Sequence, residues 1–69
     1  MEEFALEGHD YIELCDLLKV VGLCASGGEA KQRIAAGQAR VDGAVELRKR
    51  CKIRRGQTVE FAGERIAVV

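Results

Sequence analysis

The residues of this sequence best suited to a chemical task form a short run of cations between positions 48 and 55. Six of the eight residues are basic, namely Arg48, Lys49, Arg50, Lys52, Arg54 and Arg55. We call residues 48–55 the basic segment. In an extended chain alternate side chains point to opposite faces, so the even-numbered cations are predicted to share one side while Cys51 and Ile53 point inward. A ridge of this kind fits a phosphate backbone, because each neutralised phosphate releases a condensed counterion.

Two other roles are compatible with the basic segment. Dense charge can keep a small protein soluble, and a polybasic patch can bind anionic lipid. A solubilising surface normally mixes both signs of charge, and no apolar anchor accompanies the segment. The sequence therefore favours contact with nucleic acid and predicts no membrane partner.

A second candidate phosphate site lies at the start of an expected helix. Gly27 and Gly28 place no side chain in front of the first free N–H groups of that helix, and Lys31 follows one turn later. Ser26 and Glu29, however, have the spacing of a capping box, which would use some of the same donors. The sequence leaves both interpretations open.

Nothing in the sequence predicts catalysis or a bound metal. The 69 residues form one small domain, predicted to span residues 1–69, in which a substrate cavity is difficult to enclose. His9 is the only histidine, and no nucleophile is paired with it by spacing. The three cysteines, Cys15, Cys24 and Cys51, lack the close spacing of a zinc knuckle and are odd in number, so we predict no metal, no cofactor and no disulfide. Cys15 and Cys51 are expected instead as partly buried small hydrophobic residues.

The formal net charge is zero, but the charges are separated along the chain. Residues 1–16 contain six acidic residues and no Lys or Arg, whereas residues 31–55 contain nine bases and two acids. This asymmetry predicts a face for an anionic partner. The alternative is a protein-interaction adapter whose acidic N-terminal region binds a basic partner. The acidic N-terminus lacks the bases of a secretory signal, and no apolar run could span a membrane, so we expect a cytoplasmic protein.

Two helices are expected to position these residues. The first should begin with Asp10 as its N-cap, with Glu13 completing a capping box, and should end at Gly22. Its apolar stripe consists of Leu14, Leu17, Leu18 and Val21. The second should begin at Ser26 and end at Gly37. Its core-facing residues are expected to be Ala30, Ile34 and Ala35.

After the second helix the hydrophobic period changes to that of strands. Asp42-Gly43 is a strong signal for a two-residue hairpin, and further turns are expected at 54–57 and 62–64. A weaker signal predicts another strand around residues 4–6. The sequence therefore predicts an α+β fold in which a helical hairpin packs on a small antiparallel β-sheet. The inward-facing residues of the last strands are expected to be Val59, Phe61, Ile66 and Val68.

In this order and spacing, the residues resemble the S-four RNA-binding domain, whose two-helix core is called the alpha-L motif. The residues that carry the resemblance are Leu14, Leu18, Gly22, Leu23, Ser26, Ala30, Ile34, Gly37, Val41, Asp42, Gly43, Gly56, Gln57 and Val59. Within that family the chain is similar to the small stand-alone bacterial proteins of the YbcJ type, through residues 13–18 and 41–53.

The resemblance implies a partner, which is structured RNA such as ribosomal or transfer RNA. It implies a binding face made of the helical hairpin and the following loop, with Ser26, Gly27, Lys31, Gln38 and Arg40. The family usually carries Arg at the positions of Glu13 and Gly27, so two of its usual phosphate contacts are absent. We therefore expect Lys31, Arg33 and the basic segment to contribute more of the binding. With only three aromatic residues, base stacking is expected to add little, and the protein is expected to act as a monomer.

Overall fold

The computed structural model describes residues 1–69, which form two helices and seven strands. The helices are α1 (Leu14–Val20) and α2 (Gly27–Ala35). The strands are β1 (Glu2–Phe4), β2 (Ile12–Glu13), β3 (Ala39–Val41), β4 (Ala44–Val45), β5 (Lys52–Ile53), β6 (Thr58–Phe61) and β7 (Glu64–Val68). Neither helix has the length and apolarity that crossing a membrane would require.

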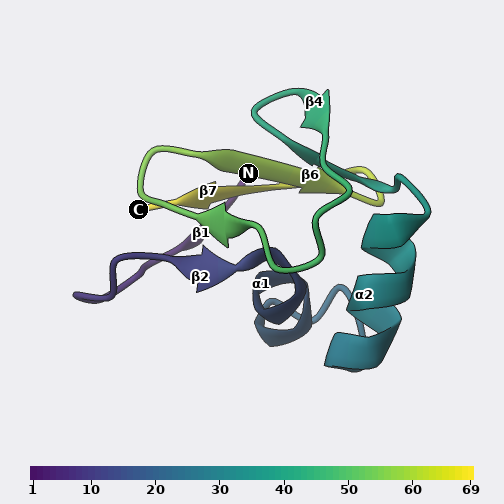
Figure 1. Ribbon diagram of the computed structural model, residues 1–69. Helices are drawn as coiled ribbons and strands as arrows, with labels where there is room; N and C mark the ends of the chain where they lie inside the picture. The colour runs from purple at the N-terminus through teal and green to yellow at the C-terminus, as the bar shows by residue number, and fades with distance from the viewer.

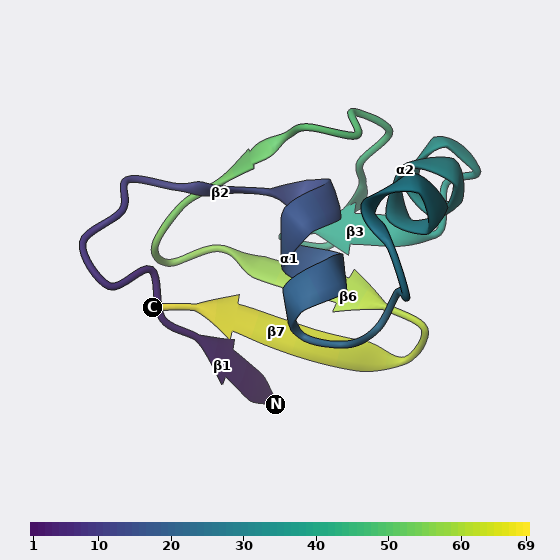
Figure 2. The same ribbon diagram turned by 90° about the horizontal axis from the view of Figure 1, so that it is seen from below.

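The strands form two sheets. Five of them make one sheet in the order β1-β7-β6-β3-β4, and β2 pairs with β5 in a separate two-stranded sheet. Both helices lie on the same side of the larger sheet (Figures 1 and 2), which confirms the predicted α+β class and its helical hairpin. One pairing differs from the expected antiparallel sheet, since β1 runs parallel to β7. These strands come from opposite ends of the chain, so no tight turn between them requires an antiparallel pairing.

The core consists of 15 buried residues, and all of them are hydrophobic. The stripe predicted for α1 is confirmed, although Val21 is only partly buried. On α2, Ala30 and Ile34 are buried while Ala35 is exposed, because consecutive residues of a helix point about 100° apart. The predicted inner faces of the last strands are also confirmed by the burial of Val59, Phe61, Ile66 and Val68.

The first helix begins later than the sequence predicts. Asp10 is not its N-cap, because Ile12 and Glu13 extend as β2 and pair with β5. Glu13 precedes Leu14, the first helical residue, with an extended backbone (φ −70°, ψ 142°) and no side-chain capping bond. Pairing with a strand distant in sequence supplies backbone partners here, so the local capping signal is overridden.

The second helix follows its sequence signals. The Ser26 hydroxyl accepts a hydrogen bond from the Glu29 N–H at 3.1 Å, which confirms the predicted cap. The Glu29 carboxylate accepts the reciprocal bond from the N–H of Ala25, the residue before the cap, at 2.9 Å. The helix ends at Ala35, and Gly37 follows with a φ of +81°, a backbone conformation that costs glycine least.

The predicted hairpin between β3 and β4 is also present. Asp42 and Gly43 have φ values of +50° and +85°, as a two-residue type I′ turn requires. The Asp42 carboxylate also accepts hydrogen bonds from the Thr58 N–H at 2.9 Å and from the Gln57 amide at 3.3 Å. This residue therefore joins the hairpin to the turn that follows the basic segment.

Candidate nucleic-acid interface

The basic segment is fixed to the start of α1 through its backbone. The N–H of Leu14 donates to the Cys51 carbonyl at 2.9 Å, and the N–H of Cys15 donates to the Lys49 carbonyl at 3.1 Å. The first N–H groups of a helix have no acceptor within the helix. The basic segment supplies acceptors for two of them and thereby takes the place of an N-terminal cap. Its side chains consequently project from a fixed backbone.

The inward and outward residues of the basic segment agree with the prediction, but its path does not. Cys51 is 9% exposed and Ile53 is fully buried, whereas all six cations are exposed. The chain turns at 48–51, where the Cys51 N–H donates to the Arg48 carbonyl at 3.2 Å, and only β5 is a strand. Alternation of faces requires an extended backbone. The expected extended path is therefore wrong for the first half of the segment, although Arg48, Arg50 and Lys52 still line one hollow.

Arg48 is bound to a carboxylate of its own chain. Its Nε and Nη2 donate to the two carboxylate oxygens of Glu46 at 2.9 and 3.0 Å, and its backbone N–H donates to the same group at 3.0 Å. Hydrogen bonds from Arg48 lower the pKa of Glu46 to about 2, and the same pair raises the pKa of Arg48. The charge of Arg48 is thus already compensated, and its side chain mainly holds the start of the basic segment.

This ion pair should make stability depend on acid pH. Because the pKa of Glu46 falls from 4.5 to about 2 on folding, the carboxylate stabilises the folded protein fully above pH 4.5. That contribution should disappear as the pH falls through about 2. We expect Glu46→Gln to lower the free energy of unfolding at neutral pH and to approach the wild type near pH 2, as measured by urea denaturation. In an Arg48→Met background, where the pair is absent, Glu46→Gln should produce a much smaller pH-dependent difference; an undiminished one would contradict this assignment.

Lys52 and Arg54 lie on the outer face of the ribbon that β2 and β5 form. The register pairs β2 antiparallel with β5, and Ile53 points into the core, so its neighbours Lys52 and Arg54 point outward. The Nζ of Lys52 lies 5.0 Å from the ring centroid of Tyr11, and the guanidinium carbon of Arg54 lies 5.6 Å from it. Neither cation has a carboxylate partner. These are the uncompensated charges nearest to an exposed aromatic ring.

The other cations of the basic segment are also largely free. Arg50 is held only loosely, with its Nε 3.9 Å from a carboxylate oxygen of Glu13. Lys49 and Arg55 are exposed and form no ion pair. A hollow of about 410 Å³ opens within the basic segment, lined by Arg48, Arg50, Cys51 and Lys52. A phosphate entering this hollow would meet mostly positive charge.

Arg33 and Gln38, which are predicted at the helical end of the interface, form their contacts with groups of the protein itself. The Nε of Arg33 donates to the side-chain oxygen of Gln38 at 2.7 Å, and its Nη1 donates to Glu29 at 3.3 Å. The Arg33 guanidinium also lies 5.0 Å from the ring centroid of Phe61. Arg33 and Gln38 therefore fix the end of α2 against β6.

The remaining predicted residues are placed as follows. The Ser26 hydroxyl is used by the cap, but Gly27 has open space where a side chain would begin. Lys31 has no ion-pair partner. Arg40 is exposed and donates to the carbonyl of Gly43 at 3.3 Å. Lys31 and Arg40 thus keep their charges available, whereas Ser26 does not keep its hydroxyl free.

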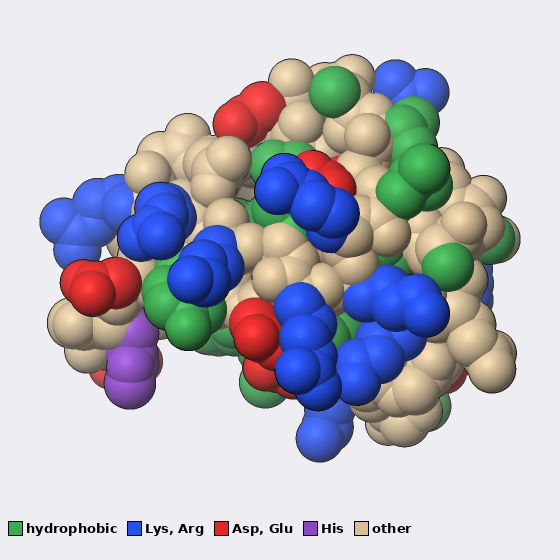
Figure 3. Space-filling view, viewed as in Figure 1, with side chains coloured by type: hydrophobic (Ala, Val, Ile, Leu, Met, Phe, Trp, Pro, Cys, Tyr) green, Lys and Arg blue, Asp and Glu red, His purple; other side chains and the backbone are tan.

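One side of the molecule carries many Lys and Arg side chains. Figure 3 shows Lys and Arg side chains spread across the face on which α2 and the unlabelled green strand β5 lie in Figure 1, with fewer acidic side chains among them. Basic side chains therefore gather on this side of the molecule. An anionic ligand larger than a single phosphate could contact several of them at once.

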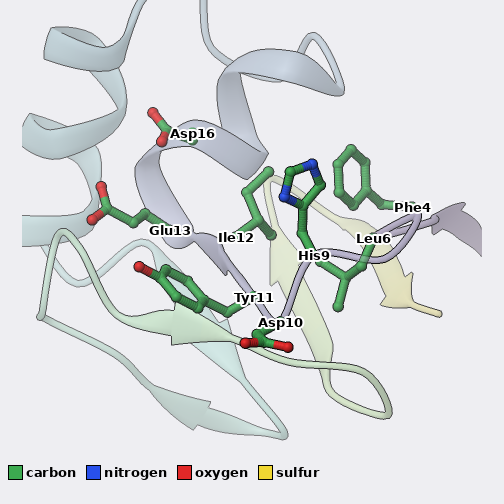
Figure 4. Close-up of a pocket in the computed structure, with 8 residues that line it drawn as sticks. All are labelled: Phe4, Leu6, His9, Asp10, Tyr11, Ile12, Glu13 and Asp16. Atoms are coloured by element: carbon green, nitrogen blue, oxygen red, sulfur yellow. The ribbon is translucent and has the colours of Figure 1, made fainter.

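Tyr11 is the surface residue that sequence reasoning missed. Phe61 is buried and Phe4 is half-buried, but Tyr11 is 38% exposed. Figure 4 shows its ring on the same side of β2 as the Glu13 carboxylate, at the rim of a hollow of about 780 Å³. The two-residue spacing of Tyr11 and Glu13 indicates a shared face only once β2 is known to be a strand.

One group of potential metal ligands is present. Oxygen and sulfur atoms of Glu13, Cys15 and Asp16 lie within 4.8 Å of one another, but Cys15 is buried and Asp16 is exposed. All three cysteines are free. Burial raises the pKa of the Cys24 and Cys51 thiols, which disfavours the thiolate that metal binding or nucleophilic attack would need.

Comparisons with known proteins agree with this geometry. A sequence model of the S4 domain matches residues 4–69. The chain is 59% identical over 69 residues to the "Putative RNA-binding protein YbcJ" of Escherichia coli (strain K12), covering 100% of this chain and 99% of that protein. The same values relate it to the "Uncharacterized protein YbcJ" of Shigella flexneri. The solution structure of Escherichia coli YbcJ, described as revealing an alfaL motif involved in RNA-binding, matches with a TM-score of 0.76 and covers 100% of this chain and 87% of that one.

Proposed function

The chain belongs to the S4 domain family, and from this membership we propose that it binds RNA and catalyses no reaction of its own. The family resemblance found in the sequence, including the likeness to bacterial YbcJ proteins, is confirmed. The observation that carries the proposal is the fixed backbone of the basic segment. Its carbonyls bind the start of α1, and its outward cations, apart from Arg48 and the loosely held Arg50, have no carboxylate partner.

The proposed phosphate contacts follow from which cations have no carboxylate partner or only a distant one. In the basic segment the cations without a partner are Lys49, Lys52, Arg54 and Arg55, and Arg50 joins them because Glu13 lies 3.9 Å away. Lys31 and Arg40 extend the contact toward α2 and the β3–β4 hairpin, and the open space at Gly27 lets a phosphate approach the helix start. Arg48 and Arg33 act as positioning residues, because their charges are paired inside the protein.

We propose a structured RNA, such as ribosomal or transfer RNA, as the ligand. Cations held on a fixed backbone suit a ligand whose phosphates also have fixed positions, as they have in an RNA helix. Residues 1–69 would act as one domain and as a monomer. The three free thiols are consistent with a reducing compartment such as the cytoplasm.

Salt dependence tests the proposal directly. If about four phosphates are neutralised, the logarithm of the RNA association constant should fall with the logarithm of salt concentration with a slope of about −3 to −4. Fluorescence anisotropy with a labelled RNA hairpin measures this slope.

The same assay discriminates against the adapter alternative. A protein that binds a basic partner through its acidic N-terminal region should bind an oligolysine peptide more tightly than any RNA hairpin. That ranking, or RNA binding that does not respond to salt, would contradict the proposed function.

A further inference from the structure

Tyr11 is an aromatic residue whose side chain lies outside the hydrophobic core. It is the only tyrosine in a chain that has no tryptophan, and it lies on the outer face of the β2–β5 ribbon. The ribbon pairs Ile12 with Ile53, and both of these pack toward the core. Tyr11 is left on the opposite face, where 38% of it is exposed.

The neighbours of the ring are cations that are free to bind phosphate. One residue beyond the Ile12–Ile53 pair, the register places Tyr11 opposite Arg54, with Lys52 diagonally across the ribbon. Their charged groups lie 5.6 and 5.0 Å from the ring centroid. Both cations lack carboxylate partners, so they remain available while they stay close to the ring.

A purely structural role for Tyr11 would rest on these same cation–π contacts. Such contacts contribute little stability at exposed positions. They also do not explain why the ring lies beside an open hollow. The hollow of about 780 Å³ beside Tyr11 (Figure 4) leaves one side of the ring accessible to a planar group. Its lining includes Asp10, Glu13 and Asp16 and no Lys or Arg, so a phosphate has to bind at Lys52 and Arg54, outside the hollow. A π-face next to two unpaired cations has the composition of a site for one nucleotide, because the base stacks on the ring and the cations bind the backbone.

We propose that Tyr11 stacks on an unpaired nucleobase of the RNA while Lys52 and Arg54 bind the phosphates beside it, an inference that rests on the proposed RNA-binding function. Bases inside an RNA helix are stacked on one another and cannot present a free face. The preferred ligand is therefore a helical RNA with a bulged, looped or terminal nucleotide next to the helix. Stacking tolerates any base, so this site selects the shape of the RNA rather than its sequence.

Two RNA hairpins test the proposal, one with a fully paired stem and one with a single bulged adenosine in the same stem. The wild-type protein should bind the bulged hairpin about ten-fold more tightly. Tyr11→Leu should remove this preference and bind both hairpins as the wild type binds the paired one, whereas Tyr11→Phe should retain it. Circular dichroism of both variants establishes that they fold.

A spectroscopic signal reports the stacking independently. Because the chain has one tyrosine, selective labelling gives ring resonances that belong to Tyr11 alone. These resonances should move upfield with the bulged hairpin and much less with the paired one.

The outcomes separate this inference from the proposed function. Equal, salt-dependent binding of both hairpins with no ring shift would overturn the stacking site and leave RNA binding intact. Binding of neither hairpin would overturn the proposed function and the stacking site with it.

Discussion

The Lys52→Ala, Arg54→Ala double variant is expected to bind a structured RNA hairpin about 30-fold more weakly than the wild type. Both side chains are exposed and have no carboxylate partner, so each is free to neutralise a phosphate. A loss of about 1 kcal/mol for each charged contact gives about 2 kcal/mol, which corresponds to the stated factor. The salt slope should flatten by about two, since two fewer counterions are released.

A variant with the same change in net charge serves as the control. Lys19→Glu also lowers the net charge by two, because it replaces one cation with an anion, but it lies in the last turn of α1, outside the basic segment. It should lower RNA affinity only slightly at moderate salt, because Lys19 lies at the opposite end of α1 from the basic segment and salt screens exposed charges. If the two variants lose affinity equally, net charge rather than the basic segment determines binding, and the proposed interface is wrong.

Ile53→Ala is expected to lower the free energy of unfolding by about 2–4 kcal/mol. Ile53 is fully buried and is the inward residue that holds β5 to β2 and to the core. A chain of this size holds only about 3–5 kcal/mol in its core, so the variant should be largely unfolded under mild denaturing conditions. Urea denaturation followed by circular dichroism measures the loss.

Two further variants serve as controls, one that keeps the protein folded and one that truncates an exposed side chain. Ile53→Val should cost about 1 kcal/mol and leave a folded protein, whose RNA affinity can then be compared with that of the wild type. Leu47→Ala truncates a side chain that is 58% exposed, so it should change stability by less than about 0.5 kcal/mol. A cost at Leu47 as large as that at Ile53 would contradict the difference in burial on which this prediction rests.

Local signals predicted those elements whose determinants lie within a few residues of one another. The cap of α2 depends on Ser26 and Glu29, and the hairpin depends on the backbone of Asp42 and Gly43. Side-chain caps and positive-φ turns act over three or four positions, so the sequence displays them directly. The same kind of signal failed at Asp10, where a strand distant in sequence competes for the backbone.

The paired charges at the candidate interface are a second feature that local sequence signals do not predict. Residue type alone groups Arg48 and Arg33 with the other cations, because the sequence does not show which cation has a partner. The structure places Arg48 on Glu46 and Arg33 between Glu29 and Gln38. A cation contributes to binding only when no nearer carboxylate already compensates it.

The sequence by itself determined the α+β class, the family, the core stripes and the position of the basic segment, because periodicity and local turn chemistry are written in consecutive residues. The tertiary structure alone decided that the backbone of this segment caps α1 and that Tyr11 stands beside Lys52 and Arg54. Both facts depend on the register between β2 and β5, which are separated in sequence by the whole helical hairpin and by the β3–β4 hairpin. Such a register is set by packing Ile53 into the core, and a one-residue shift would turn every side chain of the ribbon to its other face.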